Sequence, residues 1–291
     1  MIGSVETLIQ LAHDNNSTIG RAMIKYEAQM KQLSEHEVLQ QMKRNWQVMK
    51  ESITTGIEHP QRSKGGLIGG EARQLYDYCA AQSNLLSGPN IMEAVSYAMA
   101  VAEVNATMGR IVACPTAGSC GIVPGVLRKL QEIDNLTDEQ IAEALMTCAG
   151  IGMVIAHRAS VSGAVGGCQA ECGAAAAMAS AAAVELRGGT PEQAGEACAM
   201  VIKNVMGLVC DPVAGLVEVP CAKRNALGAS LAMVMADMAL SGVKSVIPVD
   251  EVITAMGAVG RSLPESLRET ARGGLAVTPT GLALNKKIFG E

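Results

Sequence analysis

The chain has 291 residues, with 23 Lys and Arg against 28 Asp and Glu, so its formal net charge is −5. This acidic balance argues against a dedicated nucleic-acid-binding protein, because neutralising phosphates requires a surplus of basic side chains. Hydrophobic residues make up 49% and charged residues 18% of the chain, which excludes general disorder. Only 2% of the residues are aromatic and Ala is abundant, which argues against an all-β fold and favours closely packed helices.

The predicted elements begin with a polar, amphipathic stretch, residues 4–54, which indicates one or two solvated helices ahead of the core. A glycine-rich loop follows at 63–72. Two helix starts carry a Thr three residues before a Gln, the pattern of a capping box, and predict helices over 138–156 and 191–206. The remaining helix candidates are 90–108, 172–187, 222–241 and 250–256.

Four irregular segments, punctuated by Gly and Pro, interrupt these helices: 114–124, 160–173, 207–221 and 272–281. In a helical protein, loops held by rigid neighbours are where reacting groups usually lie. We therefore expect the functional residues in these four segments.

The nine cysteines and the first residues of the chain indicate the cellular compartment of the protein. Residues 1–16 are acidic and polar where a secretory signal would have its apolar stretch. Uncharged runs such as 145–156 and 174–184 are shorter than the roughly 20 residues that cross a bilayer, so they predict buried helices and no membrane contact. We expect a cytoplasmic protein whose cysteines stay reduced.

Three cysteines stand where Gly or Pro breaks the regular backbone: Cys168, Cys210 and Cys221. Such positions suit thiolates that point at a metal, although the long spacings and the lack of a CxxC pair argue against a zinc finger or a ferredoxin-type run. Two closer pairs could also supply ligands, Cys114 with Cys120 and Cys168 with Cys172, and packing is the alternative for Cys114 and Cys172. For three others, small buried hydrophobic residues are the favoured interpretation: Cys79, Cys148 and Cys198.

Polar residues of the first irregular segment allow two interpretations. Thr116, Ser119 and the amides around Gly118 form either a nest for a small anion such as a carboxylate or an ordinary turn. His157, at a predicted helix end, is more typical of a side chain that interacts with the helix dipole than of a catalyst. The glycines at 65–70 do not match a dinucleotide-binding fingerprint.

Taken together, four segments resemble the alpha chain of the iron–sulfur-dependent L-serine dehydratases: CPTAGSCGIVPGVL (114–127), SGAVGGCQAECG (162–173), GLVCDPVAGLVEVPCAKRNA (207–226) and ETARGGLA (269–276). The resemblance runs from residue 90 to residue 276. It implies deamination of L-serine to pyruvate and ammonia by a [4Fe–4S] cluster, without pyridoxal phosphate, on an all-helical domain. The cluster ligands of that family match Cys168, Cys210 and Cys221, and three thiolates leave one iron open as a Lewis acid.

The resemblance also implies roles for polar residues near the cluster. The substrate-binding candidates are Thr116, Gly118, Ser119, Cys120 and Asn225. The catalytic candidates are Thr116, Ser119, Asp211 and Arg272. Motif position suggests that Asp211, Arg224, Asn225 and Arg272 orient the substrate carboxylate or bond to the cysteine ligands.

A partner chain is implied as well. Single-chain members of the family carry a preceding domain with an SSSHT-type segment, whose His is thought to serve in catalysis. None of the four histidines here stands in such a segment. We therefore expect a separate beta chain and little activity of this chain alone. The sequence ends in KKIFGE, whereas some single-chain members end in a Cys that caps the open iron, so water, substrate or another group is expected there.

The expected fold is all-α, with Gly- and Pro-rich loops converging on a cluster site. An N-terminal helical segment, residues 1–60, precedes the catalytic domain, residues 61–291, and the two form one continuous domain. Two alternative functions stay open. The first is a related dehydratase acting on threonine or another β-hydroxy acid, and the second is a non-catalytic helical module whose cysteines are structural or bind zinc.

Overall fold

The computed structural model describes residues 2–290. Over that range the fold is all-α, as predicted, without a β-strand, and one isolated parallel bridge joins Cys210 to Arg268. The α-helices are α1 (Val5–Asp14), α2 (Ile19–Lys31), α3 (Glu35–Glu58), α4 (Glu71–Ala81), α5 (Gly88–Ala106), α6 (Ile122–Asp134), α7 (Asp138–Arg158), α8 (Gly163–Gly166), α9 (Ala174–Leu186), α10 (Pro191–Val205), α11 (Cys221–Leu240), α12 (Val249–Ser262) and α13 (Pro279–Phe289). A π-helical turn, Gln169–Gly173, leads into α9.

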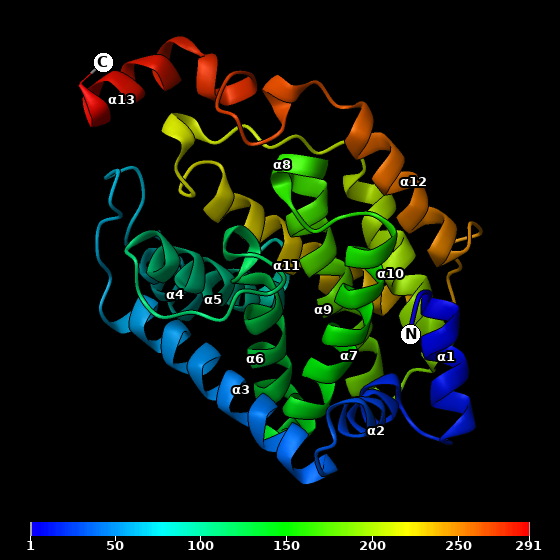
Figure 1. Ribbon diagram of the computed structural model, residues 1–291. Coiled ribbons are helices and arrows are strands. Elements are labelled where there is room, and N and C mark those ends of the chain that lie inside the picture. The colour runs from blue at the N-terminus through cyan, green and yellow to red at the C-terminus, as the bar shows by residue number, and fades with distance from the viewer. Residues whose placement is uncertain (1, 291) are drawn as a thin grey trace.

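The alanine-rich helix α9 is the centre of the bundle. Every residue from Ala174 to Val184 is buried, because α6, α7, α10 and α11 surround the helix (Figure 1). Nearly all of these side chains are methyl groups, so the neighbouring helices can approach closely without large side chains between them. A helix that is apolar on all sides must lie inside the protein.

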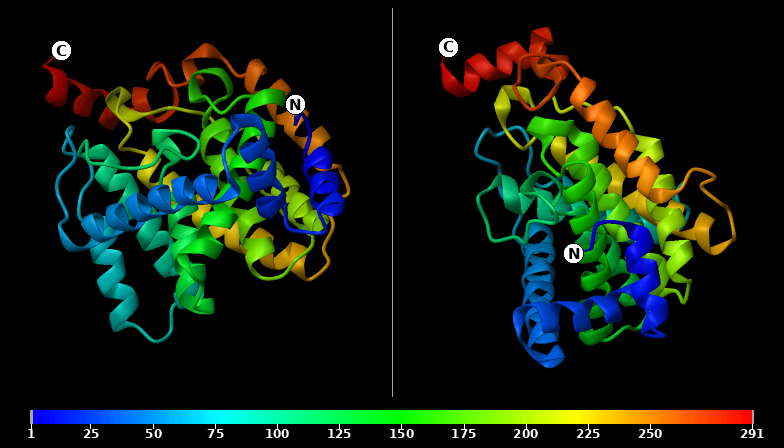
Figure 2. Two further views of the ribbon diagram at one scale, coloured as in Figure 1. Left: turned by 60° about the horizontal axis from the view of Figure 1, so that its bottom comes forward. Right: turned by 45° about the vertical axis from the view of Figure 1, so that its right-hand side comes forward.

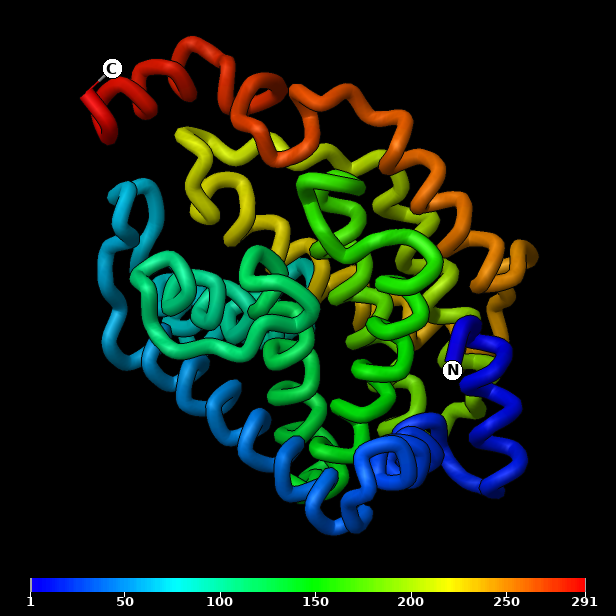
Figure 3. Tube along the Cα trace, in the orientation of Figure 1, coloured from blue at the N-terminus to red at the C-terminus, as the bar shows by residue number. Residues whose placement is uncertain are grey.

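The order of the helices determines where the loops lie. A four-residue connection joins α9 to α10, and such short connections place helices antiparallel. The start of α9, the end of α10 and the start of α11 therefore meet at one end of the bundle. Figure 3 shows the segment after α10, in yellow, passing there between α11 and the orange and red C-terminal segment.

The N-terminal segment differs from its prediction. It forms three helices, α1 to α3, which run along the outside of the bundle (Figure 2). They are not solvated helices ahead of the core, since Leu8, Ile24 and Trp46 are fully buried in the main hydrophobic cluster. Side-chain caps by Thr18 and Ser34 begin the second and third helices. The domain boundary at residue 60 stays a prediction.

Both predicted capping boxes are confirmed at Thr137 and Thr190. Four helices were not predicted, namely α4, α6, α8 and α13. The last of these begins inside the segment expected to be irregular, where Thr278 caps the helix and Pro279 takes its first position. The predicted helix at 250–256 extends to Ser262.

One helix is long and apolar enough to resemble a membrane span, contrary to the sequence estimate. This helix is α7, with a mean hydropathy of 1.3 over its best window. However, 67% of that window is buried inside the structure, where α7 packs on α2, α3 and α9. The same composition is expected of a core helix.

Close backbone contact between α3 and α5 gives a first prediction. A Cβ built on Gly56 would lie 2.4 Å from the carbonyl oxygen of Ala100, whereas one on Gly195 in α10 would make only ordinary contacts. We expect Gly56→Ala to lower the free energy of unfolding by about 1–3 kcal/mol, because the helices must separate. Gly195→Ala should be neutral or slightly stabilising. Urea denaturation measures both, and equal effects would contradict the close packing of α3.

Glu185, near the end of α9, gives a prediction about pH. Its carboxylate accepts hydrogen bonds from Thr147 Oγ1 and from the amide of Ile19 at the start of α2. Burial nevertheless raises the pKa of Glu185 above its ordinary value. A raised folded-state pKa means that the folded state holds the proton more tightly than the unfolded state, so this group destabilises the protein as the pH rises through that pKa.

We therefore expect the stability of the wild type relative to Glu185→Gln to fall between pH 4.5, the ordinary pKa, and neutral pH. Urea denaturation across this pH range measures the difference. Glu51→Gln, at an exposed position of α3, is the matched control. A pH-independent difference for Glu185→Gln would show that burial does not perturb this carboxyl group.

Candidate active site

The three cysteines predicted as metal ligands lie in one buried region. Cys168 precedes the π-helical turn, Cys210 follows α10, and Cys221 is the first residue of α11. Each of them is at most 8% exposed. The thiols of Cys168 and Cys210 shift each other's pKa, and the charge of Cys168 also raises the pKa of Cys221. The structure thus brings the three thiols together, and their role as ligands stays a prediction.

A fourth thiol, Cys172, lies 3.5 Å from the Cys168 sulfur. Hydrogen bonds from Cys172 and then Cys210, with the nearby Arg224 guanidinium, lower the pKa of the Cys168 thiol well below its ordinary value. Burial raises the pKa of Cys221 to about 12. Cys168 is therefore the thiol of this group whose surroundings most favour the thiolate form.

Asp211 and Arg224 hold the loop that follows α10. Arg224 donates to Asp211 Oδ1 and to the carbonyl oxygen of Val209, both at 2.8 Å. Asp211, which is 4% exposed, also accepts a 2.8 Å hydrogen bond from the amide of Leu275. A Cβ on Gly274, whose φ is +57°, would lie 2.4 Å from this carboxylate. Asp211 therefore ties the Cys210 loop to the C-terminal segment, which is a positioning role.

Asn225 connects the first irregular segment to α11. Its amide nitrogen donates to the carbonyl oxygens of Gly118 and Cys221, at 2.8 and 2.9 Å, and its oxygen accepts from the amide of Gly121. Both donor hydrogens are used, and the side chain is 1% exposed. The structure thus gives Asn225 contacts that position the loop, and its predicted role in substrate binding is not tested.

Glu171, in the π-helical turn, is the main site residue that the sequence analysis missed. Its Oε1 accepts a 2.7 Å hydrogen bond from Thr116 Oγ1, and Thr116 lies 3.1 Å from Ser119 Oγ. Burial, followed by the charges of Cys168 and Glu269, raises the pKa of Glu171 to about 7. A π-helical turn often marks a functional site, which is a signal that the sequence does not display.

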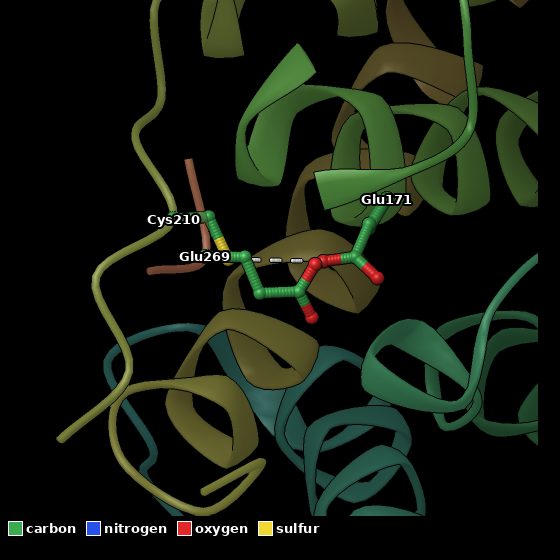
Figure 4. A group of neighbouring side chains, drawn as sticks. All are labelled: Glu171, Cys210 and Glu269. Carbon is green, nitrogen blue, oxygen red and sulfur yellow. Dashed lines mark hydrogen bonds between the residues drawn. The ribbon is translucent and has the colours of Figure 1, made fainter. Parts of the chain in front are cut away.

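Glu269 brings a second carboxylate to the same place. Ligand atoms of Glu171, Cys210 and Glu269 lie within 4.8 Å of one another, a geometry that could hold a metal ion (Figure 4). The backbone amide of Glu269 donates to the carbonyl oxygen of Cys210 at 2.8 Å, while the Cys210 amide donates to Leu267. The C-terminal segment thus lies directly against the thiol site.

Two other predicted residues, Arg272 and Cys120, have contacts of their own outside these hydrogen bonds. The side chain of Arg272 is 75% exposed and pairs with the equally exposed Glu265. Cys120 is fully buried, with its thiol 3.9 Å from the carbonyl oxygen of Val101 in α5. The roles predicted for them stay predictions. Cys148 and Cys198 are fully buried inside helices, in agreement with a packing role.

A second buried carboxylate supports the glycine-rich loop at 63–72. Glu218, 2% exposed, accepts hydrogen bonds from Ser63 Oγ and the amides of Gly65 and Leu67. These hydrogen bonds therefore tie the glycine-rich loop to the segment between Cys210 and Cys221. No motif in the sequence pointed to that pairing, because the two segments are far apart along the chain.

Comparisons with known proteins show which family the sequence resembles. A family model described as "Serine dehydratase alpha chain" matches residues 14–276. The chain is 52% identical to the probable L-serine dehydratase alpha chain of Bacillus subtilis, covering 100% of this chain and 96% of the relative. It is 41% identical to the L-serine dehydratase alpha chain of Peptoniphilus asaccharolyticus, covering 100% and 99%. It is also 36% identical to the L-serine dehydratase of Streptomyces coelicolor, covering 94% of this chain but 60% of that longer protein.

The hydrogen bonds of Asn225 give a prediction about the site's framework. Asn225→Ala leaves the buried amide of Gly121 and the carbonyl oxygen of Gly118 without this partner, so we expect the free energy of unfolding to fall by about 2–4 kcal/mol. Urea denaturation measures this change. Asn45→Ala, at an exposed position of α3, should change it by less than about 0.5 kcal/mol. Similar small values for both would mean that Asn225 does not hold the loop.

Proposed function

The chain belongs to the serine dehydratase alpha chain family, and we propose that it is the alpha chain of an L-serine ammonia-lyase, which converts L-serine to pyruvate and ammonia. The observation that carries this proposal is the meeting of Cys168, Cys210 and Cys221 in one buried region. The full-length similarity to chains named as L-serine dehydratase subunits supports the substrate.

The donor set fits an iron–sulfur cluster by its chemistry. Three buried thiols come from segments of irregular backbone, and all nine cysteines of the chain are free. Soft thiolate ligands of this kind select iron–sulfur clusters or zinc. We propose that Cys168, Cys210 and Cys221 hold a [4Fe–4S] cluster, which when bound supplies a Lewis acid for the departing hydroxyl group. Arg224, whose charge helps to lower the pKa of Cys168, offsets part of the negative charge there.

The chain's own residues would bind and orient the substrate. The Thr116 hydroxyl group donates to Glu171, and the Ser119 hydroxyl group beside it can donate to the substrate carboxylate. The buried walls of the site exclude water and strengthen such polar contacts. Loss of the Cα proton and of hydroxide then yields aminoacrylate, which tautomerises to an imine and hydrolyses to pyruvate and ammonia. We assign Asp211 and Asn225 to positioning these loops.

We propose that a separate beta chain completes the enzyme. This chain spans 60% of the Streptomyces coelicolor relative, whose name designates no subunit, so that relative contains a further region. A beta chain would supply the equivalent region, including the base that removes the Cα proton. The free cysteines support a reducing compartment, and we propose the cytoplasm.

The ligand assignment is tested by paired cysteine variants. After anaerobic reconstitution, the wild type should hold iron and sulfide in near-equal amounts and turn over L-serine when the beta chain is added. Cys210→Ser should lose the iron, because a cluster ligand is removed. Cys198→Ser is the control and should retain it, because this thiol is buried inside α10.

Iron and sulfide analysis, with visible absorption spectra, measures the result. The reverse pattern would overturn the ligand assignment. A colourless zinc protein would instead favour the non-catalytic alternative, and turnover of threonine in preference to serine would favour a related dehydratase.

A further inference from the structure

We propose that the carboxylates of Glu171 and Glu269 together bind the ammonium group of the substrate amino acid. This inference rests on the proposed function and assigns the group that distinguishes an amino acid from a hydroxy acid. Both residues lie beside Cys210 (Figure 4), and neither is among the predicted site residues.

Glu171 presents a buried oxygen that lacks a strong donor. The residue is 8% exposed, and its Oε1 is used by Thr116. Among residues 2–290, the hydrogen-bond donor found for Oε2 is the thiol of Cys210, at 3.9 Å. A thiol is a weak donor, and this one is lost if Cys210 binds metal as a thiolate. A buried carboxylate oxygen in this position needs a donor from a ligand.

Glu269 lies next to Glu171 Oε2, on the side that faces solvent. Its side chain is exposed, so the pair can be reached from solvent. Gly163 lies against both carboxylates, since a Cβ there would be 2.5 Å from Glu171 Oε2 and 3.0 Å from Glu269 Oε2. The two acidic groups therefore converge over one glycine next to the thiols.

The charges at this point favour a bound cation. The charged groups that act most strongly on Glu171 are themselves acidic, Cys168 and Glu269. Arg224, the nearby guanidinium, is already paired with Asp211. Two carboxylates so close together repel each other when both are ionised, and a positive group between them relieves this repulsion. The ammonium group of an amino acid carries that charge, and its three N–H donors match Glu171 Oε2, the Glu269 carboxylate and Thr116 Oγ1.

The test compares L-serine with L-glycerate, which carries a hydroxyl group in place of the ammonium group. The anaerobically reconstituted chain is assayed with its beta chain, measuring KM for L-serine and Ki for L-glycerate. In Glu269→Gln we expect KM to rise about 10- to 100-fold, because a charged hydrogen-bonding partner is lost. Ki should stay unchanged or fall, and the iron content should stay that of the wild type. Glu171→Gln should likewise raise the KM for L-serine while the Ki for L-glycerate stays unchanged or falls.

Glu251→Gln, on the exposed side of α12, is the matched control and should change neither constant. An unchanged KM in Glu269→Gln, or an equal rise of KM and Ki, would overturn the inference. Loss of iron from Glu269→Gln would also overturn it. So would a divalent ion other than iron that is bound to the wild type and absent from both Glu variants. If the wild type holds no cluster and does not turn over L-serine, the proposed function itself fails. If the wild type holds the cluster and turns over L-serine, an unchanged KM in Glu269→Gln contradicts only the ammonium site and leaves the proposed function standing.

Discussion

The packing of methyl groups around α9 is the constraint on which the rest of the structure depends. Because Ala174 to Val184 are all buried, α10 and α11 can lie directly against this helix. The alternating direction of the three helices then places Cys168, Cys210 and Cys221 at one end of the bundle. Thiols far apart in the sequence thus become neighbours without any local motif. Larger side chains on α9 would push α10 and α11 away from this helix. The three thiols would then move apart, although no residue of the site itself had been changed.

Buried polar side chains fix the loops that the helices bring together. Asp211, Glu218 and Asn225 are each at most 4% exposed, and each bonds to backbone groups of another irregular segment. Backbone groups in a buried loop need such partners, because they have no helix or sheet to bond within. A site built in this way is held at defined positions, which catalysis by orientation requires. In the proposed site, the paired carboxylates of Glu171 and Glu269 serve a ligand instead of the loops.

The sequence predicted the parts of this arrangement that have local causes. Capping boxes at Thr137 and Thr190 mark their helices correctly, and the uncharged alanine run predicts a buried helix. The interruptions by Gly and Pro also indicated the segments that carry the thiols. Residues without a local signal were missed. Glu171 acquires its role from a π-helical turn and from the distant Thr116 and Glu269, and neither contact leaves a pattern in the sequence.

The most direct test of this account is an anaerobic crystal structure of the reconstituted chain, with anomalous diffraction measured at the iron edge. The account predicts one compact iron feature bonded to the sulfurs of Cys168, Cys210 and Cys221. Iron located elsewhere, or a metal bound by other cysteines while these three stay free, would contradict it.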